Sequence, residues 1–522
     1  MVDSAVIEKW LESLFKLKNN RRFMVLCGGE WGDGGKGSIE SPLLPFFDVC
    51  VRVSGGANTG RTRNVATLGG EDKSFVFHLI PSGWADGKPS YIGDWVLIDL
   101  ERLNTEIRDL VALLGFTPQA PLQISPKAPI FLPYHRFFEI WLEHCMGAGA
   151  VKTTGRGIGQ IIALADLRIG PRMGHLLYPD TLSKWVTQIW DIFEDIFNKS
   201  ASLIRLAEEK AGVPELDRFK LSDYTPDKVV QKLLADAEGL THLIAFDFDS
   251  QLLDLAKKNV AALFCLTQGW GLTHRGTYPF CSSTQITAQA ASYCSGVPMK
   301  YFGPIGQVGK LDPTRVGAGD GPTNMGWGRL EAEQFALDNP KLYSILGDKC
   351  DQEARAQFLL RKLERINSGE YAPVDVAMYW QVLLNELGAS TGRGREVLWP
   401  DLFATACGAA SNGADFIALT RLDALSGMKF DLKLGYEYCI DGVPCKVPDY
   451  PTPIERLATV NVTFDNVPIN LVEVDLAGIE SEEAFPPDIV TLLAKWEKYG
   501  GVPVGIASFS GGRDGKVFRN IA

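Results

Sequence analysis

Two glycine-rich segments near the N-terminus have the residue types needed to hold phosphate groups. The first, Gly28–Ser38, reads GGEWGDGGKGS and follows the strand-like run Phe23–Cys27. The second, Gly55–Thr62, reads GGANTGRT and follows the strand-like run Val49–Val53. Glycines let backbone N–H groups close around phosphate oxygens, and a helix that begins after such a loop adds favourable partial charge. The pattern favours nucleotide-driven chemistry.

Two side chains in the first segment could act on a bound nucleotide. Lys36 could supply a mobile positive charge to β- and γ-phosphates, and Asp33 could bind Mg²⁺ or accept a proton. The segment is not a strict Walker A loop, because Lys36 is followed by Gly37 rather than Ser or Thr. A lone Asp in a glycine loop is often a turn residue that accepts backbone N–H groups. The strand–loop–helix context nevertheless favours phosphate binding.

The composition is that of an ordinary globular protein. The chain has 522 residues, 46% of them hydrophobic, and a formal net charge of −11, which argues against a general nucleic-acid-binding surface. No apolar run approaches membrane-spanning length. The ten cysteines include no CxxC pair and no Cys/His cluster with zinc-ligand spacing, so we expect buried, reduced cysteines and a cytoplasmic protein.

Strand-like and helix-like segments alternate along the chain, which predicts an α/β fold with a large, mainly parallel sheet flanked by helices. Residues 1–22 are expected to form an N-terminal helical extension, and residues 23–522 the main domain. Helical periodicity also covers Trp185–Ala207. Further candidate strands are 51–53, 91–92, 96–98, 263–267 and 416–419.

Both glycine-rich segments resemble those of the adenylosuccinate synthetases, GTP-dependent ligases that join aspartate to inosine monophosphate (IMP). In that family the segments read GxxWGDEGKGK and GGxNAGHT. Further similar blocks follow in the family's order, so that the resemblance spans about residues 23 to 515. These blocks are 78–83, 153–159, 276–279, 314–319, 385–393 and 419–423.

The resemblance implies a P-loop-NTPase-like adenylosuccinate synthetase fold, with Mg²⁺ as cofactor, GTP as co-substrate and a homodimer as the assembly. The family has only a short connection where this chain has a charged, helix-favouring stretch at about residues 325–380. We therefore expect a helical insertion there, either a solvated surface addition or a subunit or partner contact.

The resemblance also implies a GTP site. Asp423 matches the family's guanine reader, because a carboxylate can accept from guanine N1–H and the 2-amino group, a donor pair that adenine lacks. Arg421 replaces the family's lysine next to it, and Ser508 corresponds to the other wall of the base pocket. The full set implied for GTP is Gly32, Gly34, Gly35, Lys36, Gly37, Ser38, Arg395, Arg421, Asp423 and Ser508.

For the chemistry, the resemblance implies transfer of the γ-phosphoryl group to the purine 6-oxygen, followed by displacement of that phosphate by the aspartate amine. Asp33 would be the base and a Mg²⁺ ligand, with the Gly60 carbonyl as a second metal contact and Lys36 in the phosphate cradle. The acceptor nucleotide would contact Asn58, Thr154, Gln268, Ser282 and Arg393, with Gln268 also counted as catalytic. The amino acid would contact Ser390, Thr391 and Arg393.

Three departures from the family pattern fall where the acceptor nucleotide would bind. Arg61 replaces the histidine that acts as general acid, and a guanidinium cannot shuttle a proton, although it could stabilise transferring phosphoryl charge. The segment after Gly159 is shorter and mostly apolar, and Gly34 replaces an acid. A GTP-dependent phosphotransferase or ligase acting on a different acceptor, and a catalytically silent GTP-binding regulator, therefore stay open as alternatives.

Overall fold

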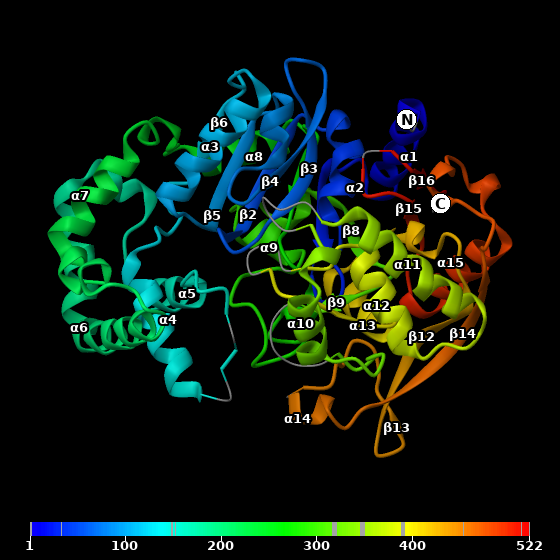
Figure 1. Cartoon of the computed structure of the whole chain (residues 1–522). Coiled ribbons are helices and arrows are strands. Elements are labelled where there is room, and N and C mark those ends of the chain that lie inside the picture. Colours follow the sequence, from blue (N-terminus) through cyan, green and yellow to red (C-terminus); the bar gives the residue numbers. More distant parts are fainter. Residues whose placement is uncertain are drawn as a thin grey trace.

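The computed structural model describes residues 3–32, 34–147, 150–151, 153–315, 321–344, 350–387, 392–452, 454–512 and 514–520. A nine-stranded sheet lies at the centre, in the order β16-β15-β11-β8-β1-β7-β2-β5-β6 (Figure 1). Neighbouring strands run parallel except for β15 and β16, which pair antiparallel. The predicted mainly parallel α/β fold is thus confirmed. The strands are β1 (Phe23–Gly28), β2 (Val49–Gly56), β5 (Ser90–Leu97), β6 (Leu122–Ile124), β7 (Ala262–Cys265), β8 (Phe302–Lys310), β11 (Phe416–Thr420), β15 (Val504–Ser508) and β16 (Lys516–Phe518).

Helices cover both faces of this sheet. Successive residues of a strand point to opposite faces, so a strand buried on both sides is apolar throughout. In β1, Met24 and Leu26 pack with α1 (Ser4–Leu17) and α2 (Lys36–Leu43). Phe23, Val25 and Cys27 pack instead with α8 (Phe248–Lys257) and α9 (Gln289–Tyr293).

The predicted N-terminal helix is α1, and it forms part of the core. Asp3 caps it by accepting a hydrogen bond from the Ala5 backbone N–H. The Trp10 ring lies edge-on to Phe416 of β11 and to Phe518 of β16, with ring centroids 5.1 Å apart in each pair. The helix therefore closes one face of the sheet near its β16 edge.

A helical lobe extends beyond the β6 edge of the sheet, at the left of Figure 1. Its helices share one apolar cluster with β5 and β6. The predicted helix at Trp185–Ala207 is confirmed as the middle of α6. The lobe and its connection to the sheet contain α3 (Leu100–Leu114), α4 (Pro133–Met146), α5 (Ile158–Asp166), α6 (Pro179–Lys210) and α7 (Pro226–Ala237).

Within the stretch at about 325–380 the described residues form α10 (Arg329–Asp338), α11 (Gln352–Asn367) and α12 (Pro373–Leu383), whereas an insertion relative to the family stays a prediction. Of the two interpretations offered for this stretch, a solvated surface addition is wrong for α12. Val376 and Trp380 of that helix are fully buried in the cluster that also holds α13 (Leu402–Asn412) and α15 (Pro487–Gly500). Only Ile366 is buried in α11, so that helix alone matches the surface description.

The remaining elements surround this framework. A long antiparallel pair, β12 and β14, projects at the lower right of Figure 1. No helix within the described ranges is both long enough and apolar enough to cross a membrane. The elements not yet given are β3 (Arg61–Ala66), β4 (Asp72–Phe77), β9 (Thr314–Arg315), β10 (Glu396–Val397), β12 (Lys429–Ile440), β13 (Val443–Pro444), β14 (Asn461–Asn470) and α14 (Ile454–Leu457).

Candidate active site

A cavity of about 490 Å³ lies where the loops that follow neighbouring parallel strands meet. In open α/β sheets the carboxyl ends of the strands face one crevice, which is the usual place for a nucleotide. Here the loops that follow β2, β7, β1, β11 and β15 all contribute to the wall. Thirteen of the residues predicted from the sequence line this cavity. They are Gly32, Gly34, Gly35, Lys36, Gly37, Ser38, Asn58, Gly60, Arg61, Thr154, Gln268, Arg395 and Arg421.

The middle of the cavity is formed by the loop between β1 and α2. Gly35 has φ +78°, a conformation that favours glycine. A Cβ atom at Gly37 would lie 2.1 Å from the Thr62 carbonyl oxygen, so only glycine lets β3 approach the start of α2 this closely. The helix begins at Lys36, with its N-terminus in the cavity wall. This geometry suits phosphate binding.

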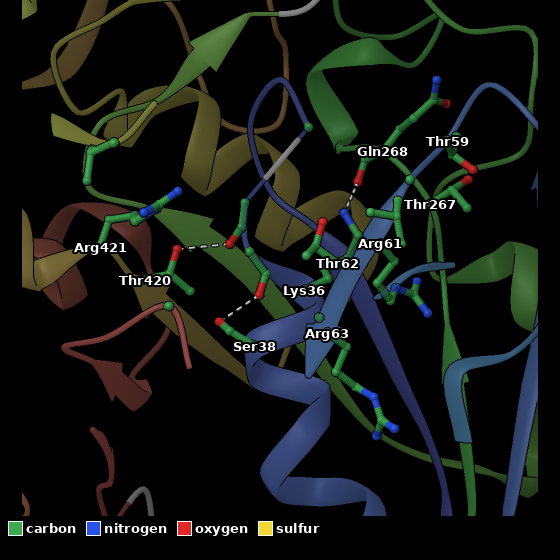
Figure 2. A pocket seen from close by; sticks show the side chains of 18 of the residues that line it. Lys36, Ser38, Thr59, Arg61, Thr62, Arg63, Thr267, Gln268, Thr420 and Arg421 are labelled. Atoms are coloured by element: carbon green, nitrogen blue, oxygen red, sulfur yellow. Dashed lines mark hydrogen bonds between the residues drawn. The ribbon is translucent and has the colours of Figure 1, made fainter. Parts of the chain in front are cut away.

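Hydrogen bonds tie this loop to both of its neighbours (Figure 2). The Lys36 Nζ donates to the Gln268 carbonyl, at 2.5 Å, on the β7 side. The Thr420 hydroxyl donates to the Gly34 carbonyl, at 2.9 Å, on the β11 side. The loop between β1 and α2 is therefore fixed between the two ends of the cavity.

At the β11 end the cavity wall consists of Arg421 and the segment Ser510–Gly512. Asp423 stands two residues after Arg421 and does not line the cavity, and its Oδ1 atom is buried without a hydrogen-bond partner among the described residues. Burial raises the pKa of this carboxyl, while Arg421 lowers it. The Ser508 hydroxyl donates to the Ser510 carbonyl at 3.1 Å, so Ser508 supports the wall rather than lining it.

At the β2 and β7 end, polar groups remain available for a ligand. Asn58, Thr154 and Gln268 line the cavity. Within the described part of the chain, Asn58 Oδ1 and the hydroxyl of Thr267 are buried and have no hydrogen-bond partner. Thr267 also lines the cavity, and the sequence patterns had not singled it out.

Ser282 does not line the cavity but is linked to it through hydroxyl groups. The Thr284 hydroxyl donates to the Gln268 side-chain oxygen at 2.9 Å and shares a second hydrogen bond, of 2.8 Å, with the Ser282 hydroxyl. This chain of hydroxyls fixes which way the Gln268 amide faces.

Arg61, at the start of β3, is held in the cavity wall by buried partners. Its Nη1 lies 3.1 Å from Glu40 Oε2, and its Nη2 donates to the Leu266 carbonyl at 3.0 Å. Arg61 is only 7% exposed and Glu40 is fully buried. Burial lowers the pKa of Arg61, but its neighbours, Glu40 first and then Cys265 and Cys50, raise it, so the net pKa is raised. The guanidinium is thus a fixed positive charge.

Glu386 joins several cations near the segment that the resemblance assigned to the amino acid. Its Oε1 accepts from Lys310 Nζ at 2.8 Å, and its Oε2 accepts from Arg395 Nη1 at 2.9 Å. Asp312 lies 3.6 Å from the same Lys310 ammonium, and burial raises the pKa of this carboxyl to about 7. Sequence reasoning missed this cluster, although Glu386 stands in one of the similar blocks.

The remaining predicted residues lie outside the cavity or outside the described ranges. Arg393 is described but does not line the cavity. Asp33, Ser390 and Thr391 lie outside the described residues. Among the residues that the structure describes, no three His, Cys, Asp or Glu side chains come together in a way that could hold a metal ion.

Comparisons with known proteins place nearly the whole chain in one family. The adenylosuccinate synthetase family pattern matches residues 25–517. The adenylosuccinate synthetase of Nitratidesulfovibrio vulgaris is 29% identical over 499 residues, which cover 95% of this chain and 99% of the relative. That of Myxococcus xanthus is 29% identical over 489 residues, covering 92% and 94%.

A solved structure shows the same fold. The fully ligated adenylosuccinate synthetase from Plasmodium falciparum superposes with a TM-score of 0.73, at 22% identity, over 96% of this chain and all of the other. The family match covers nearly the whole chain, and so does the structural superposition. This protein belongs to the adenylosuccinate synthetase family, whose members are ligases that form a carbon–nitrogen bond with GTP.

Proposed function

We propose that this protein joins aspartate to the purine base of IMP, with GTP as the phosphoryl donor. The γ-phosphoryl group moves from GTP to the 6-oxygen of IMP as the N1 proton leaves to a base. The aspartate amine then forms a bond to C6, and the C6–O bond breaks to release phosphate. The observation that carries this proposal is one continuous cavity, which joins the phosphate loop at Lys36 to Asn58, Thr154 and Gln268 on the acceptor side.

The residues around the cavity support placing GTP at its β11 end and IMP at its β2 and β7 end. Asp423, with its unpartnered carboxylate oxygen, would read guanine beyond Arg421, and Lys36 with the loop backbone would hold the phosphates. IMP would lie at the β2 and β7 end, with Gln268 facing the base and Asn58 and Thr154 facing its phosphate. Both nucleotides then approach the phosphate loop from opposite sides, which is the arrangement that in-line transfer needs.

Arg61 would act through its fixed charge. Its guanidinium is bound by Glu40 and by the Leu266 carbonyl. We therefore assign Arg61 the role of holding β3 and the cavity wall beside the transferred phosphoryl group. A raised pKa leaves it protonated throughout the working range. The proton of IMP would go to Asp33, as the family resemblance implies.

Family members use Mg²⁺ with GTP, and the residues at this cavity fit such an ion. At nucleotide phosphates Mg²⁺ takes one or two protein oxygens and completes its shell with phosphate oxygens and water. Asp33 and the Gly60 carbonyl would hold it here, since Gly60 lies in the wall beside the phosphate loop. The ion would neutralise charge on the phosphates.

The segment around Arg393 is the proposed site for the amino acid. Aspartate would bind Ser390, Thr391 and Arg393, because an arginine fork matches a carboxylate. Arg395, held by Glu386, would face the GTP side of the same segment.

We also propose a homodimer in the cytoplasm, with residues 1–22 as an extension and about 325–380 as an insertion relative to the family.

A different acceptor is the second candidate, and only Arg61 favours it. A phosphotransferase would leave a phosphorylated product that persists when aspartate is present. Membership of a ligase family does not favour this outcome. Phosphate release matched one-to-one by succinylated nucleotide would exclude it.

Asp423→Asn tests the base pocket. An amide at this position can donate to the 2-oxo group of xanthine but no longer accepts two hydrogen bonds from guanine. Loss of a charged hydrogen bond, worth about 1.5–3 kcal/mol, predicts a KM for GTP that is roughly 10- to 150-fold higher. The KM for xanthosine triphosphate should fall in the same variant.

The matched control is Asp441→Asn, at an exposed turn between β12 and β13. It should leave the KM for both nucleotides unchanged. Equal KM values for GTP in Asp423→Asn and the unaltered protein would show that guanine binds elsewhere.

A further inference from the structure

Lys516, the first residue of β16, has an ammonium group surrounded by carbonyl oxygens. Its side chain is fully buried, although it follows a glycine-rich segment whose described residues include Ser510–Gly512 and Asp514. The Nζ atom donates to the carbonyls of Ser510 at 2.8 Å, Gly512 at 2.7 Å and Asp514 at 3.0 Å. Carbonyls that converge in this way resemble the shell of a bound monovalent cation. Here the Lys516 ammonium takes the place of such a cation.

The loop held by Lys516 is the same loop that closes the β11 end of the cavity. Ser510, Gly511 and Gly512 line the cavity, and the carbonyls of Ser510 and Gly512 are two of the three that Lys516 binds. Ser508, opposite Lys516 in the antiparallel pair, donates its hydroxyl to the Ser510 carbonyl as well. The position of this wall therefore depends on contacts made behind it.

We propose that Lys516 is a positioning residue for the nucleotide base: its ammonium acts as a built-in cation that holds the Ser510–Gly512 wall in the shape that receives guanine. This inference rests on the proposed base pocket beside Asp423. Lys516 does not touch the nucleotide itself. It acts through the loop carbonyls.

The wall needs the charged form of the lysine. An ammonium has three N–H donors for the three carbonyls, whereas a neutral amine has only two donors and a lone pair that would face an oxygen. Burial lowers the pKa of Lys516 to about 8, against the opposing effect of Asp423 and Asp514, the charged groups that act on it. Affinity for GTP should therefore decrease as the pH rises through about 8, because the wall loses its central donor.

The test compares Lys516→Met with the unaltered enzyme by the KM for GTP and the KM for IMP. Methionine keeps the length and burial of the side chain but offers no donor. We expect the KM for GTP to rise about tenfold or more, as the loss of hydrogen bonds from a charged donor implies. The kcat and the KM for IMP should stay within about threefold. The matched control, Lys446→Met at an exposed position, should change none of these constants.

Two further readouts separate this role from a merely structural one. In the unaltered enzyme the KM for GTP should rise between about pH 7 and 9, and in Lys516→Met it should be flat over that range. In Lys516→Ala, which leaves space among the three carbonyls, added propylammonium should lower the KM for GTP toward the normal value. The pH profile of the unaltered enzyme needs no variant to fold.

The inference is overturned if Lys516→Met leaves the KM for GTP unchanged, if it raises the KM for GTP and IMP equally, or if it keeps the normal pH profile. If Asp423→Asn shifts the base preference but Lys516→Met has no effect, only this inference fails. If Asp423→Asn leaves the base preference unchanged, the proposed base pocket itself is wrong.

Discussion

At the scale of single residues, Arg61 departs from the family pattern, and the structure pairs it with Glu40. The sequence predicted a cation that stabilises the transferring phosphoryl group. The structure gives that cation a buried carboxylate partner, which also accepts a hydrogen bond from the Ser82 hydroxyl at 2.7 Å. Glu40 lies four residues after Lys36, one helical turn along α2, so the helix that begins the phosphate site also fixes Arg61. No local sequence pattern could predict this ion pair, because Glu40 belongs to α2 and Arg61 to β3.

Arg61→Met should destabilise the fold by about 3–5 kcal/mol, because it leaves a buried carboxylate without its cation. The measurement is the free energy of unfolding in urea. Adding Glu40→Gln should recover much of the loss, since glutamine keeps an acceptor for Ser82 and carries no charge. A double variant no more stable than Arg61→Met would contradict the assignment of Arg61 as a buried ion-pair partner.

Asp312 should make stability depend on pH. Its pKa is raised from 3.8 to about 7 in the folded state, mainly by burial. Between those values the folded protein binds a proton that the unfolded chain does not, so the stabilising effect of protonated Asp312 is fully present below about pH 4 and lost as the pH rises to about 7.

Asp312→Asn removes this dependence. The free energy of unfolding of the unaltered protein, minus that of the variant, should fall between about pH 4 and 7 by a few kcal/mol at most, at ~1.4 kcal/mol per pKa unit. Urea titrations at several pH values measure the difference. A difference that stays constant with pH would show that Asp312 is ionised throughout.

At the scale of elements, the sequence predicted what local patterns can encode. Apolar runs that end in glycine-rich loops gave β1, β2 and the phosphate loop, and helical periodicity gave α1 and the centre of α6. The stretch at about 325–380 was judged by its charge, which belongs mostly to α11. The burial of α12 was missed because its partners, among them β12 and α15, lie far along the chain.

Trp10→Ala tests whether α1 belongs to the core. Trp10 is 5% exposed and contacts Phe416 and Phe518 of the central sheet. Truncating a buried tryptophan should cost about 3–5 kcal/mol of unfolding free energy. Leu17→Ala, at a position of the same helix that is 58% exposed, is the control and should change stability by less than about 0.5 kcal/mol. A similar small effect of Trp10→Ala would show that α1 only decorates the surface.

At the scale of the whole molecule, the order of the strands explains why distant blocks form one site. The cavity is lined by loops that follow β2 and β7, where we propose the acceptor binds, by the loop after β1, and by the loops after β11 and β15, where we propose guanine binds. In the sheet these strands stand in the order β15, β11, β8, β1, β7, β2. Sheet order depends on crossovers between distant segments, so the sequence could predict the blocks from their resemblance but not their arrangement around one cavity.

The most direct test of the proposed function follows the 6-oxygen of the acceptor. The enzyme is given IMP labelled with ¹⁸O at this position, together with GTP, Mg²⁺ and aspartate, and the products are analysed by mass spectrometry. We predict that the label moves into inorganic phosphate, with one GDP and one adenylosuccinate formed per labelled phosphate. Unlabelled phosphate, or GDP formed without a succinylated nucleotide, would contradict the account.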